Sequence, residues 1–298
     1  MFYAEFKTIF TNDSKDFFRI RDWKYTDPAE LPRPESITPQ QVPEKPKALN
    51  LFTDAVAPLR EEGREVINIR VSESMMMERA RQCGATPASW LSVLLCRAVS
   101  RLHPDFSNGV PTVSMAVNLR KAINTPLAHQ PMVGSFTIPF SQTIARKSMK
   151  EQVKDCRQWI ALQTQQDNLR AYYYGMQDGM TQLEQVPSLE MRHELLSQRL
   201  AALSANATVS LSYVGRADMG AAERYVREIQ TESPSLYAVL VEVSAVNGSF
   251  CISFIQQFAA DDYLEAFLAE LGQQGMAYEI ADRHMVLLAP LADFRKSI

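Results

Sequence analysis

The chain has 298 residues, of which 46% are hydrophobic and 22% charged, and its formal net charge is −3. This composition is ordinary for a globular protein with a sizeable core, and without a basic cluster it gives no electrostatic support for nucleic acid binding. No stretch approaches the ~20 apolar residues of a membrane helix, so no membrane partner is expected. The N-terminal residues lack the basic start and apolar run of a signal peptide, and we expect a cytoplasmic protein.

The cysteines give no sign of a metal centre or of a disulfide framework. They lie far apart, with no Cys-x-x-Cys pair, at Cys83, Cys96, Cys156 and Cys251. Zinc sites and disulfide-rich domains space their cysteines more closely. We therefore expect reduced thiols in or near the core, no metal ligands and no bound cofactor.

The first fifty residues differ in composition from the rest of the chain. They hold many of the prolines, at positions Pro28, Pro32, Pro34, Pro39, Pro43 and Pro46. Proline at this density interrupts helices and sheet ladders, so residues 27–47 should form an extended arm that wraps a surface. Residues 2–10 alternate roughly between apolar and polar side chains, which suits one strand at a sheet edge. We therefore divide the chain into an N-terminal strand and proline-rich arm, 1–50, and one lobe, 51–298.

Regular secondary structure is expected from residue 66 onward. Residues 66–71 alternate as a strand, and Ser72 can cap a helix that reaches Gln82 and ends at Gly84. Thr86 and Pro87 provide an N-cap and a first helical residue for a buried helix to about residue 102. Further strands are predicted at 113–120, 136–140 and 208–214, and further helices after the capping box Ser148-x-x-Glu151 and over 188–204.

A β-hairpin gives the clearest local signal. Residues 236–246 and 249–258 are alternating apolar runs joined by Asn247-Gly248, the dipeptide that a type I′ turn favours. Asp262-x-x-Glu265 should then cap a helix to about residue 274, with Gly272 and Gly275 marking its end, and residues 285–288 suit a last strand. Because strands and helices are interleaved, we predict an α/β fold with a mixed β-sheet flanked by helices.

No histidine sits in a recognisable catalytic pattern. No two of them adjoin, and none is followed four residues later by aspartate; they are His103, His129, His193 and His284. Nucleophile elbows, phosphate loops and His-Glu-x-x-His motifs are absent as well. We therefore assign no catalytic residue from the sequence.

The predicted strand 113–120 has an unusual second face. Alternation places Ser114, Ala116, Asn118 and Arg120 together, opposite a row of apolar residues. Small and polar residues along a whole strand face point to a cleft, a water-lined tunnel or a buried partner charge, or else to a solvated sheet face. If Arg120 points inward, it requires an acidic partner.

Four segments, taken in order, resemble a known superfamily. They are residues 72–102 with Gly84-Ala-Thr-Pro87 inside, Val117-Asn-Leu-Arg120, Val133-Gly-Ser-Phe136, and Leu211-Ser-Tyr-Val-Gly-Arg-Ala-Asp218. Together they resemble the C-terminal half of the condensation domains of nonribosomal peptide synthetases, chloramphenicol acetyltransferase-like enzymes and alcohol acetyltransferases. The resemblance covers about residues 66–290. Ser212 stands where asparagine is usual in that superfamily.

The resemblance implies one lobe of a chloramphenicol acetyltransferase-like two-lobed fold with a tunnel between the lobes. The acyl donor, a thioester of coenzyme A or of phosphopantetheine, would be a substrate that enters opposite the acceptor alcohol or amine. The implied tunnel-lining candidates are Ser114, Ser135, Ser212, Tyr213 and Gly215. Asn118 and Arg120 would lie at the interlobe face, where Arg120 pairs with an aspartate of the N-terminal lobe.

The chain departs from the superfamily because it lacks the His-His-x-x-x-Asp motif that carries the general base. We expect an acyltransferase only if an N-terminal lobe from the same gene or a neighbouring chain completes it, and no activity from the chain alone. Two alternatives stay open. One is a catalytically silent relative with a binding or structural role, and the other is an assembly protein that forms homo-oligomers through the exposed interlobe face.

Overall fold

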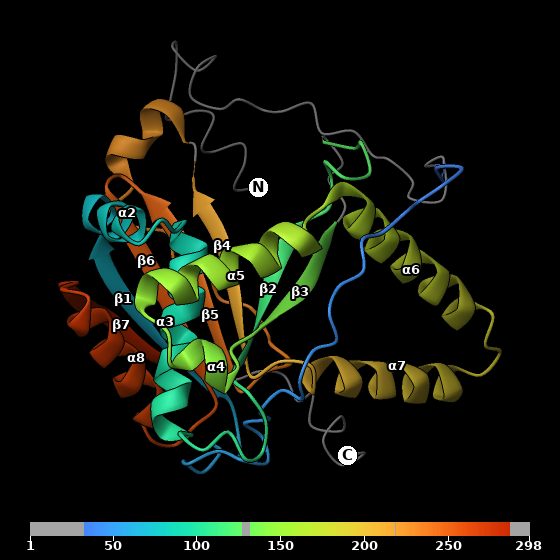
Figure 1. The fold of residues 1–298 in the computed structure, drawn as a ribbon, viewed down its shortest axis with the longest axis horizontal. Coiled ribbons are helices and arrows are strands. Elements are labelled where there is room, and N and C mark those ends of the chain that lie inside the picture. Colours follow the sequence, from blue (N-terminus) through green and yellow to red (C-terminus); the bar gives the residue numbers. More distant parts are fainter. Residues whose placement is uncertain (1–32, 127–131, 218, 287–298) are drawn as a thin grey trace, which may run out of the picture.

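The computed structural model describes residues 33–126, 132–217 and 219–286 (Figure 1). In this part of the chain, seven strands form one sheet in the order β3-β2-β4-β5-β6-β1-β7. Their bounds are β1 Arg64–Ser72, β2 Thr112–Asn118, β3 Val133–Pro139, β4 Val209–Arg216, β5 Val239–Val246, β6 Ser249–Gln256 and β7 Tyr278–Val286. β4 is parallel to β2 and to β5, whereas the other neighbours are antiparallel. The prediction of a mixed α/β sheet is confirmed.

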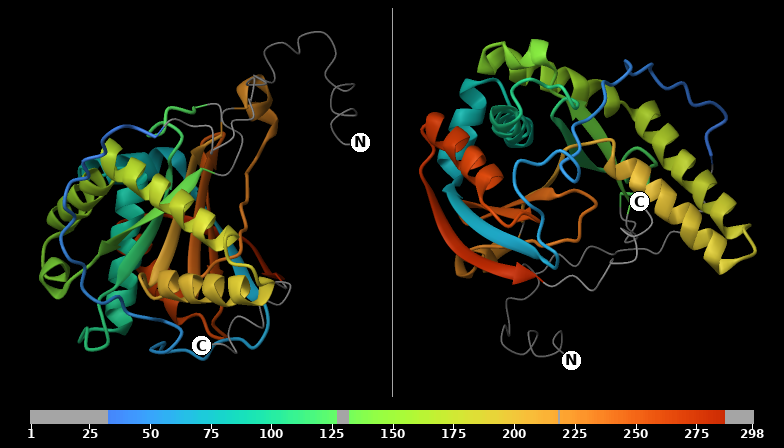
Figure 2. Two further views of the ribbon diagram at one scale, coloured as in Figure 1. Left: turned by 90° about the vertical axis from the view of Figure 1, so that its right-hand side faces the viewer. Right: turned by 90° about the horizontal axis from the view of Figure 1, so that it is seen from below.

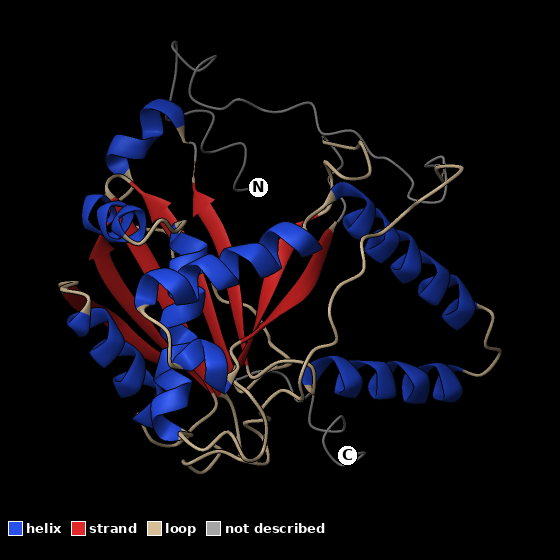
Figure 3. Ribbon diagram, viewed as in Figure 1, coloured by secondary structure: helices blue, strands red, loops and turns tan. Residues whose placement is uncertain are grey.

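Helices pack against one face of this sheet, as the two layers in Figure 3 show. The helices are α2 Glu73–Gln82, α3 Pro87–Leu102, α4 Gln142–Ala145, α5 Met149–Gln163, α6 Gln166–Glu184, α7 Leu189–Ser204 and α8 Asp262–Gln273, with a 3₁₀ helix η2 at Gly220–Tyr225. α3 is the central helix and buries Trp90 and Leu94 against the strands. α6 and α7 extend away from the sheet beside β3 (Figure 1).

The core lies between the sheet and these helices because the strands alternate as expected. Ile67 and Ile69 of β1, and Val241 and Val243 of β5, are fully buried in it. Burying one such side chain contributes about 1.5–3 kcal/mol. The intervening residues of the same strands must therefore point to the opposite face of the sheet.

Two of the predicted helix caps and the hairpin turn form where the sequence places them. Ser72 Oγ accepts a hydrogen bond from the backbone N of Met75 at 3.4 Å, and Thr86 Oγ1 accepts one from Ser89 N at 3.2 Å. In the hairpin turn, Asn247 and Gly248 have φ values of 47° and 79°. These are the positive values that a type I′ turn requires, so the predicted hairpin is confirmed.

Several predicted boundaries are wrong. The N-cap of α8 is Asp261 rather than Asp262, and Gly272 lies inside that helix. β2 ends at Asn118, so Arg120 follows the strand instead of belonging to it. The last strand begins at Tyr278, well before the predicted residue 285. The strand predicted for residues 2–10 lies outside the described residues.

The proline-rich arm lies along the edge of the fold beside β3. Residues 33–47 contain no helix or strand. Arg33 pairs with Asp178 of α6 at 3.0 Å, and Lys45 Nζ donates to Gln163 Oε1 of α5 at 2.7 Å. The arm is thus held against α5 and α6 by polar side chains that lie outside the main core.

The sequence reasoning missed α6, which builds a second, smaller core at the end of β2 and β3. Tyr173 and Tyr174 of α6 pack there with Leu119 and Met132. Gly134 of β3 permits this contact, since an added Cβ would lie 2.6 Å from Cε1 of Tyr172.

We predict that Gly134→Ala lowers the free energy of unfolding by about 1–3 kcal/mol, because the new methyl group overpacks the contact with Tyr172. Gly175→Ala is the matched control in α6, where an added Cβ meets nothing within 4 Å. That control should be neutral or stabilising by up to about 1 kcal/mol. Urea denaturation of both variants measures the difference, and equal stabilities would contradict the assigned contact.

Candidate functional site

The sheet face that points away from α3 carries a continuous row of polar side chains. Strand register places one residue from each of five neighbouring strands side by side: Ser212 of β4, Glu242 of β5, Ser253 of β6, Asn68 of β1 and Asp282 of β7. Such a row across the middle of a sheet is unusual, because buried polar groups require hydrogen-bonding partners. We call these five residues the polar row.

Glu242 is the most deeply buried carboxyl group of the polar row, with a relative exposure of 4%. Its Oε1 accepts a hydrogen bond from Ser233 Oγ at 2.9 Å. Burial raises the pKa of Glu242, whereas the hydroxyl groups of Ser233 and Ser212 act in the opposite direction. Beside it in the row, Ser253 Oγ donates to Asn68 Oδ1 at 2.6 Å. Glu242 thus combines a raised pKa with hydroxyl partners, a combination found at many functional sites.

An extended segment, residues 226–237, covers the part of the polar row that lies on β5, β6, β1 and β7. We call it the strap. Figure 2 (left) shows it descending from η2 along the side of the sheet opposite the helices. Arg70 Nε donates to Glu228 at 3.0 Å, and Arg64 Nη1 and Nη2 donate to the carbonyl groups of Tyr237 and Ser235 at 2.6 and 2.8 Å. Strand side chains therefore hold the strap at both ends.

The other half of this face, on β2, β3 and β4, becomes more open toward the end of β2. Ser114 is buried, whereas Ser135 and Ser212 are half-buried and Asn118 is exposed. β2 and β4 are parallel, so their carboxyl ends lie at the same edge of the sheet. Ligands of α/β proteins bind preferentially at the carboxyl ends of parallel strands. We call this edge the open edge.

The structure places the sequence-derived site residues on two different faces. Ser114, Ser135 and Ser212 share the polar face with Asn118, because they occupy alternating positions of paired strands. Tyr213 points to the helix side, where its ring lies 6.2 Å from that of Phe250. Burial and the nearby Glu73 raise the pKa of the Tyr213 hydroxyl group. Gly215 follows at a register shift of β4 with φ of 85°.

Asn118 and Arg120 form a compact turn at the open edge. Asn118 Oδ1 accepts the backbone N–H of Arg120 at 3.0 Å and lies 3.4 Å from Arg120 Nη1. The guanidinium group is therefore on the same side as the Asn118 side chain. Val133, the register partner of Asn118, and Val214 are 54% and 62% exposed. The open edge thus combines an amide, a cation and exposed valine side chains.

The described histidines lie away from the open edge. His103 Nε2 is 2.8 Å from the Tyr263 hydroxyl group at the end of α3, and burial lowers its pKa. His193 is on the exposed helix α7. His284 lies between Asp282 and Glu232, and both carboxylates raise its pKa. His129 lies outside the described residues.

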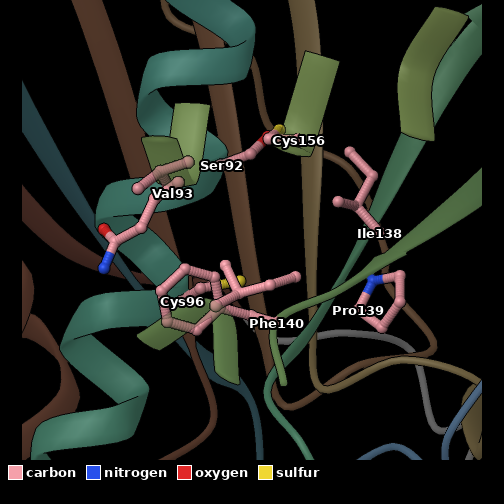
Figure 4. A pocket seen from close by; sticks show the side chains of 9 residues that line it. Ser92, Val93, Cys96, Ile138, Pro139, Phe140 and Cys156 are labelled. Carbon is pink, nitrogen blue, oxygen red and sulfur yellow. The ribbon is translucent and has the colours of Figure 1, made fainter. Parts of the chain in front are cut away.

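A small pocket lies on the helix side of the sheet, between α3, α4, α5 and the end of β3 (Figure 4). Its volume is about 10 Å³, which is enough for about one water molecule. Cys96 and Cys156 line it, and burial raises the pKa of Cys156 to about 12. The pocket is therefore too small for a substrate, and none of the predicted tunnel residues lines it.

Within residues 33–126, 132–217 and 219–286, no group of three or more histidine, cysteine, aspartate or glutamate residues is arranged to hold a metal ion. No helix in the same part of the chain is long and apolar enough to cross a bilayer.

Sequence reasoning missed Glu242 and the strap. A signal for Glu242 was present, because it interrupts the apolar run 239–246 and alternates with Leu240 and Ser244 on the same face. The strap has no such signal, since its residues 226–237 follow neither a helical nor a strand period.

The sequence itself matches no protein-family model and no curated protein. Among solved structures, the chain is similar to the nonribosomal peptide synthetase FmoA3, with a TM-score of 0.52, 12% identity and coverage of 78% of this chain and 23% of that chain. The chain is also similar to a condensation domain that mediates chain release from the enacyloxin polyketide synthase, with a TM-score of 0.48. A third similar structure is F. sporotrichioides TRI101 complexed with coenzyme A and T-2, with a TM-score of 0.49. These two show 12% and 13% identity and cover 77% and 75% of this chain.

The described residues therefore share an α/β fold with part of the FmoA3 synthetase. At such low identity the similarity concerns the fold alone. The chain spans well under two thirds of each matched chain, namely 44%, 23% and 53%.

We predict that Asn118→Ala lowers the free energy of unfolding by about 0.5–1.5 kcal/mol, because the Arg120 N–H loses its acceptor. Asn118→Asp keeps an oxygen at that position and should retain most of the stability. Chemical denaturation compares the two variants. An alanine variant as stable as the wild type would show that the turn does not depend on this side chain.

Proposed function

We propose that residues 51–298 form the C-terminal lobe of an acyltransferase-like protein that acts together with an N-terminal lobe. The observation that carries this proposal is the open edge, where the carboxyl ends of β2 and β4 present Asn118 and Arg120 beside exposed Val133 and Val214. Exposed apolar side chains around a few convergent polar groups are typical of an interaction site. The condensation-like fold supports a lobe-to-lobe contact here.

In this proposal, the tunnel for the acyl donor and acceptor runs along the polar face beside the open edge. Ser114, Ser135 and Ser212 supply hydroxyl groups on that face, and Gly215 keeps the end of β4 free of a side chain. The donor is a thioester of coenzyme A or of a carrier-bound phosphopantetheine. Tyr213 lies on the helix side and would contribute only where the tunnel passes the end of β4.

Arg120 would reach an aspartate of the second lobe, as the superfamily resemblance implies. A guanidinium group held by Asn118 is oriented before the lobes meet, which lowers the entropy lost on association. The general base would also come from the second lobe, because the described histidines lie elsewhere.

A catalytically silent assembly protein is the second candidate function, and helix α7 favours it. No residue of α7 is buried among the described contacts, although the helix carries Leu189, Leu196 and Leu203 at seven-residue spacing. A helix with this much exposed apolar surface fits a role in homo-oligomers. The same surface would also suit contact with a second lobe.

We predict that the purified chain alone does not transfer acyl groups from coenzyme A thioesters to alcohols or amines. General base catalysis contributes typically about 10²–10⁴ in rate, and no described histidine lies at the open edge to supply it. A thiol-release assay with an acceptor panel measures the rate against the uncatalysed reaction. Robust turnover that one of the His→Ala variants abolishes would place the base within this chain.

The role of Arg120 is tested after an N-terminal condensation-type lobe is added as a separate chain. We expect Arg120→Ala to weaken association or transfer by about tenfold or more and Arg120→Lys to recover only part, because an ammonium group cannot form a bidentate contact. Val133→Asp should weaken association while leaving stability within about 0.5 kcal/mol, since the side chain is largely exposed. Unchanged association in all three variants would contradict the interlobe assignment, whereas sedimentation of the chain alone as an oligomer would favour the assembly role.

A further inference from the structure

We propose that the strap, residues 226–237, is a pH-responsive cover that lies closed over the polar row in mildly acidic solution and loosens as the pH rises. The strap crosses four strands of the sheet, and two of its contacts involve ionisable groups, the Glu242 carboxyl group and the His284 imidazole. The proposal concerns the isolated chain and does not depend on acyl transfer.

The first titratable contact is the clip between Glu232 of the strap and His284 of β7. His284 Nε2 lies 2.8 Å from Glu232 Oε1, and His284 Nδ1 lies 2.6 Å from Asp282 Oδ2. Only the protonated imidazolium donates from both ring nitrogens. A neutral ring donates from one nitrogen and therefore leaves one carboxylate facing a lone pair. Across the sheet, the register partner of His284 on β1 is the apolar Val66, so β1 adds no charge directly opposite the ring.

The second titratable contact joins Ser233 of the strap to Glu242 of β5. The groups that face this carboxyl group are Ser233 and Glu232 from the strap, Ser212 from β4 and Ser253 from β6. None of these is a cation. Ionisation of Glu242 would thus place a negative charge beneath the strap, close to the negative charge of Glu232.

A third set of contacts is made by arginine side chains, which stay protonated throughout this pH range, and it serves as a reference. Arg70 of β1 binds Glu228 of the strap and Glu279 of β7, and these carboxylates raise its pKa further. Arg64 holds the carbonyl groups of Ser235 and Tyr237. Cys251, the strand neighbour of Arg70, also lies near Glu228, and burial raises its pKa to about 11. These contacts hold the two ends of the strap while its middle responds to pH.

The Glu232–His284 contact and the burial of Glu242 act in the same direction, whereas the hydrogen bond from Ser233 to Glu242 acts against them. The pKa of His284 is raised above its ordinary 6.5, first by the hydrogen bond with Asp282 of its own strand and then by Glu232 of the strap. Burial, to which the strap contributes, raises the pKa of Glu242 above its ordinary 4.5. A group whose pKa is raised in the closed state stabilises that state fully when the pH is below the ordinary pKa of the group. This stabilisation is lost as the pH rises through the raised pKa. The loss of stabilisation begins above pH 4.5 for Glu242 and above pH 6.5 for His284, which are the ordinary pKa values of these groups. Because His284 is about one third exposed, solvent reduces its share, and the buried Glu242 should contribute more.

Hydrogen–deuterium exchange of the full chain tests the proposal. Protection factors of residues 226–237, corrected for the intrinsic exchange rate, should fall by about tenfold between about pH 5.5 and about pH 8.5. Amides of α3 report global unfolding and should keep their protection over the same range. A strap whose protection does not change with pH, while α3 stays protected, would overturn the proposal.

Three variants separate the contacts. Glu242→Gln keeps an acceptor for Ser233 without a charge, so the strap should stay protected at the higher pH. His284→Gln removes the ring charge, so protection at the lower pH should fall toward that of the wild type at the higher pH. Glu228→Gln weakens the reference contact with Arg70 and should lower protection equally at both pH values.

A full wild-type pH response in both Glu242→Gln and His284→Gln would exclude the two groups as its cause. Because the measurement needs neither donor nor second lobe, its outcome is independent of the acyltransferase proposal.

Discussion

Successive side chains of a strand must point to opposite faces of the sheet, and the architecture of this protein depends on that constraint. On β1, β5 and β6 it sends one set of residues into the core beneath α3 and the other set to the polar face. A single strand can therefore serve both stability and recognition. Val241 and Val243 anchor β5 in the core, and Glu242 between them belongs to the polar row.

The polar row requires partners because buried polar groups that lose water must find other hydrogen bonds. The strap provides one such bond to the polar row, from Ser233 to Glu242, and on the same face its Ile229 carbonyl accepts a hydrogen bond from Ser244. Within the row, Ser253 donates to Asn68. On β2 the strap reaches the buried Ser114 through Tyr237, whereas among the described residues no strap contact with the exposed Asn118 is seen. The same face is thus closed on one half and open on the other, which concentrates accessible polar groups at the open edge.

The predictable parts of the fold are those with local causes. Thr86-Pro87 and Ser72 define helix starts through backbone capping, and Asn247-Gly248 defines the hairpin through positive φ. Helix α6 was not predictable, because its two glycines and several tyrosines have low helix propensity and tertiary packing of Tyr173 and Tyr174 stabilises it. For the candidate site, strand alternation correctly grouped Ser114 with Asn118. It could not reveal that Arg120 follows the strand or that the strap covers Glu242, since both depend on long-range contacts.

The outer strand β7 has a consequence for how copies of this protein behave in solution. It pairs with β1 on one side, and among the described residues no strand pairs with its other side. An unpaired edge with free backbone groups can template the addition of a strand from another molecule. β7 carries Glu279, Asp282, Arg283 and His284, and an incoming identical strand would have to bring these charges together. Such pairing would remove water from these charged side chains, which therefore oppose edge-to-edge aggregation through β7.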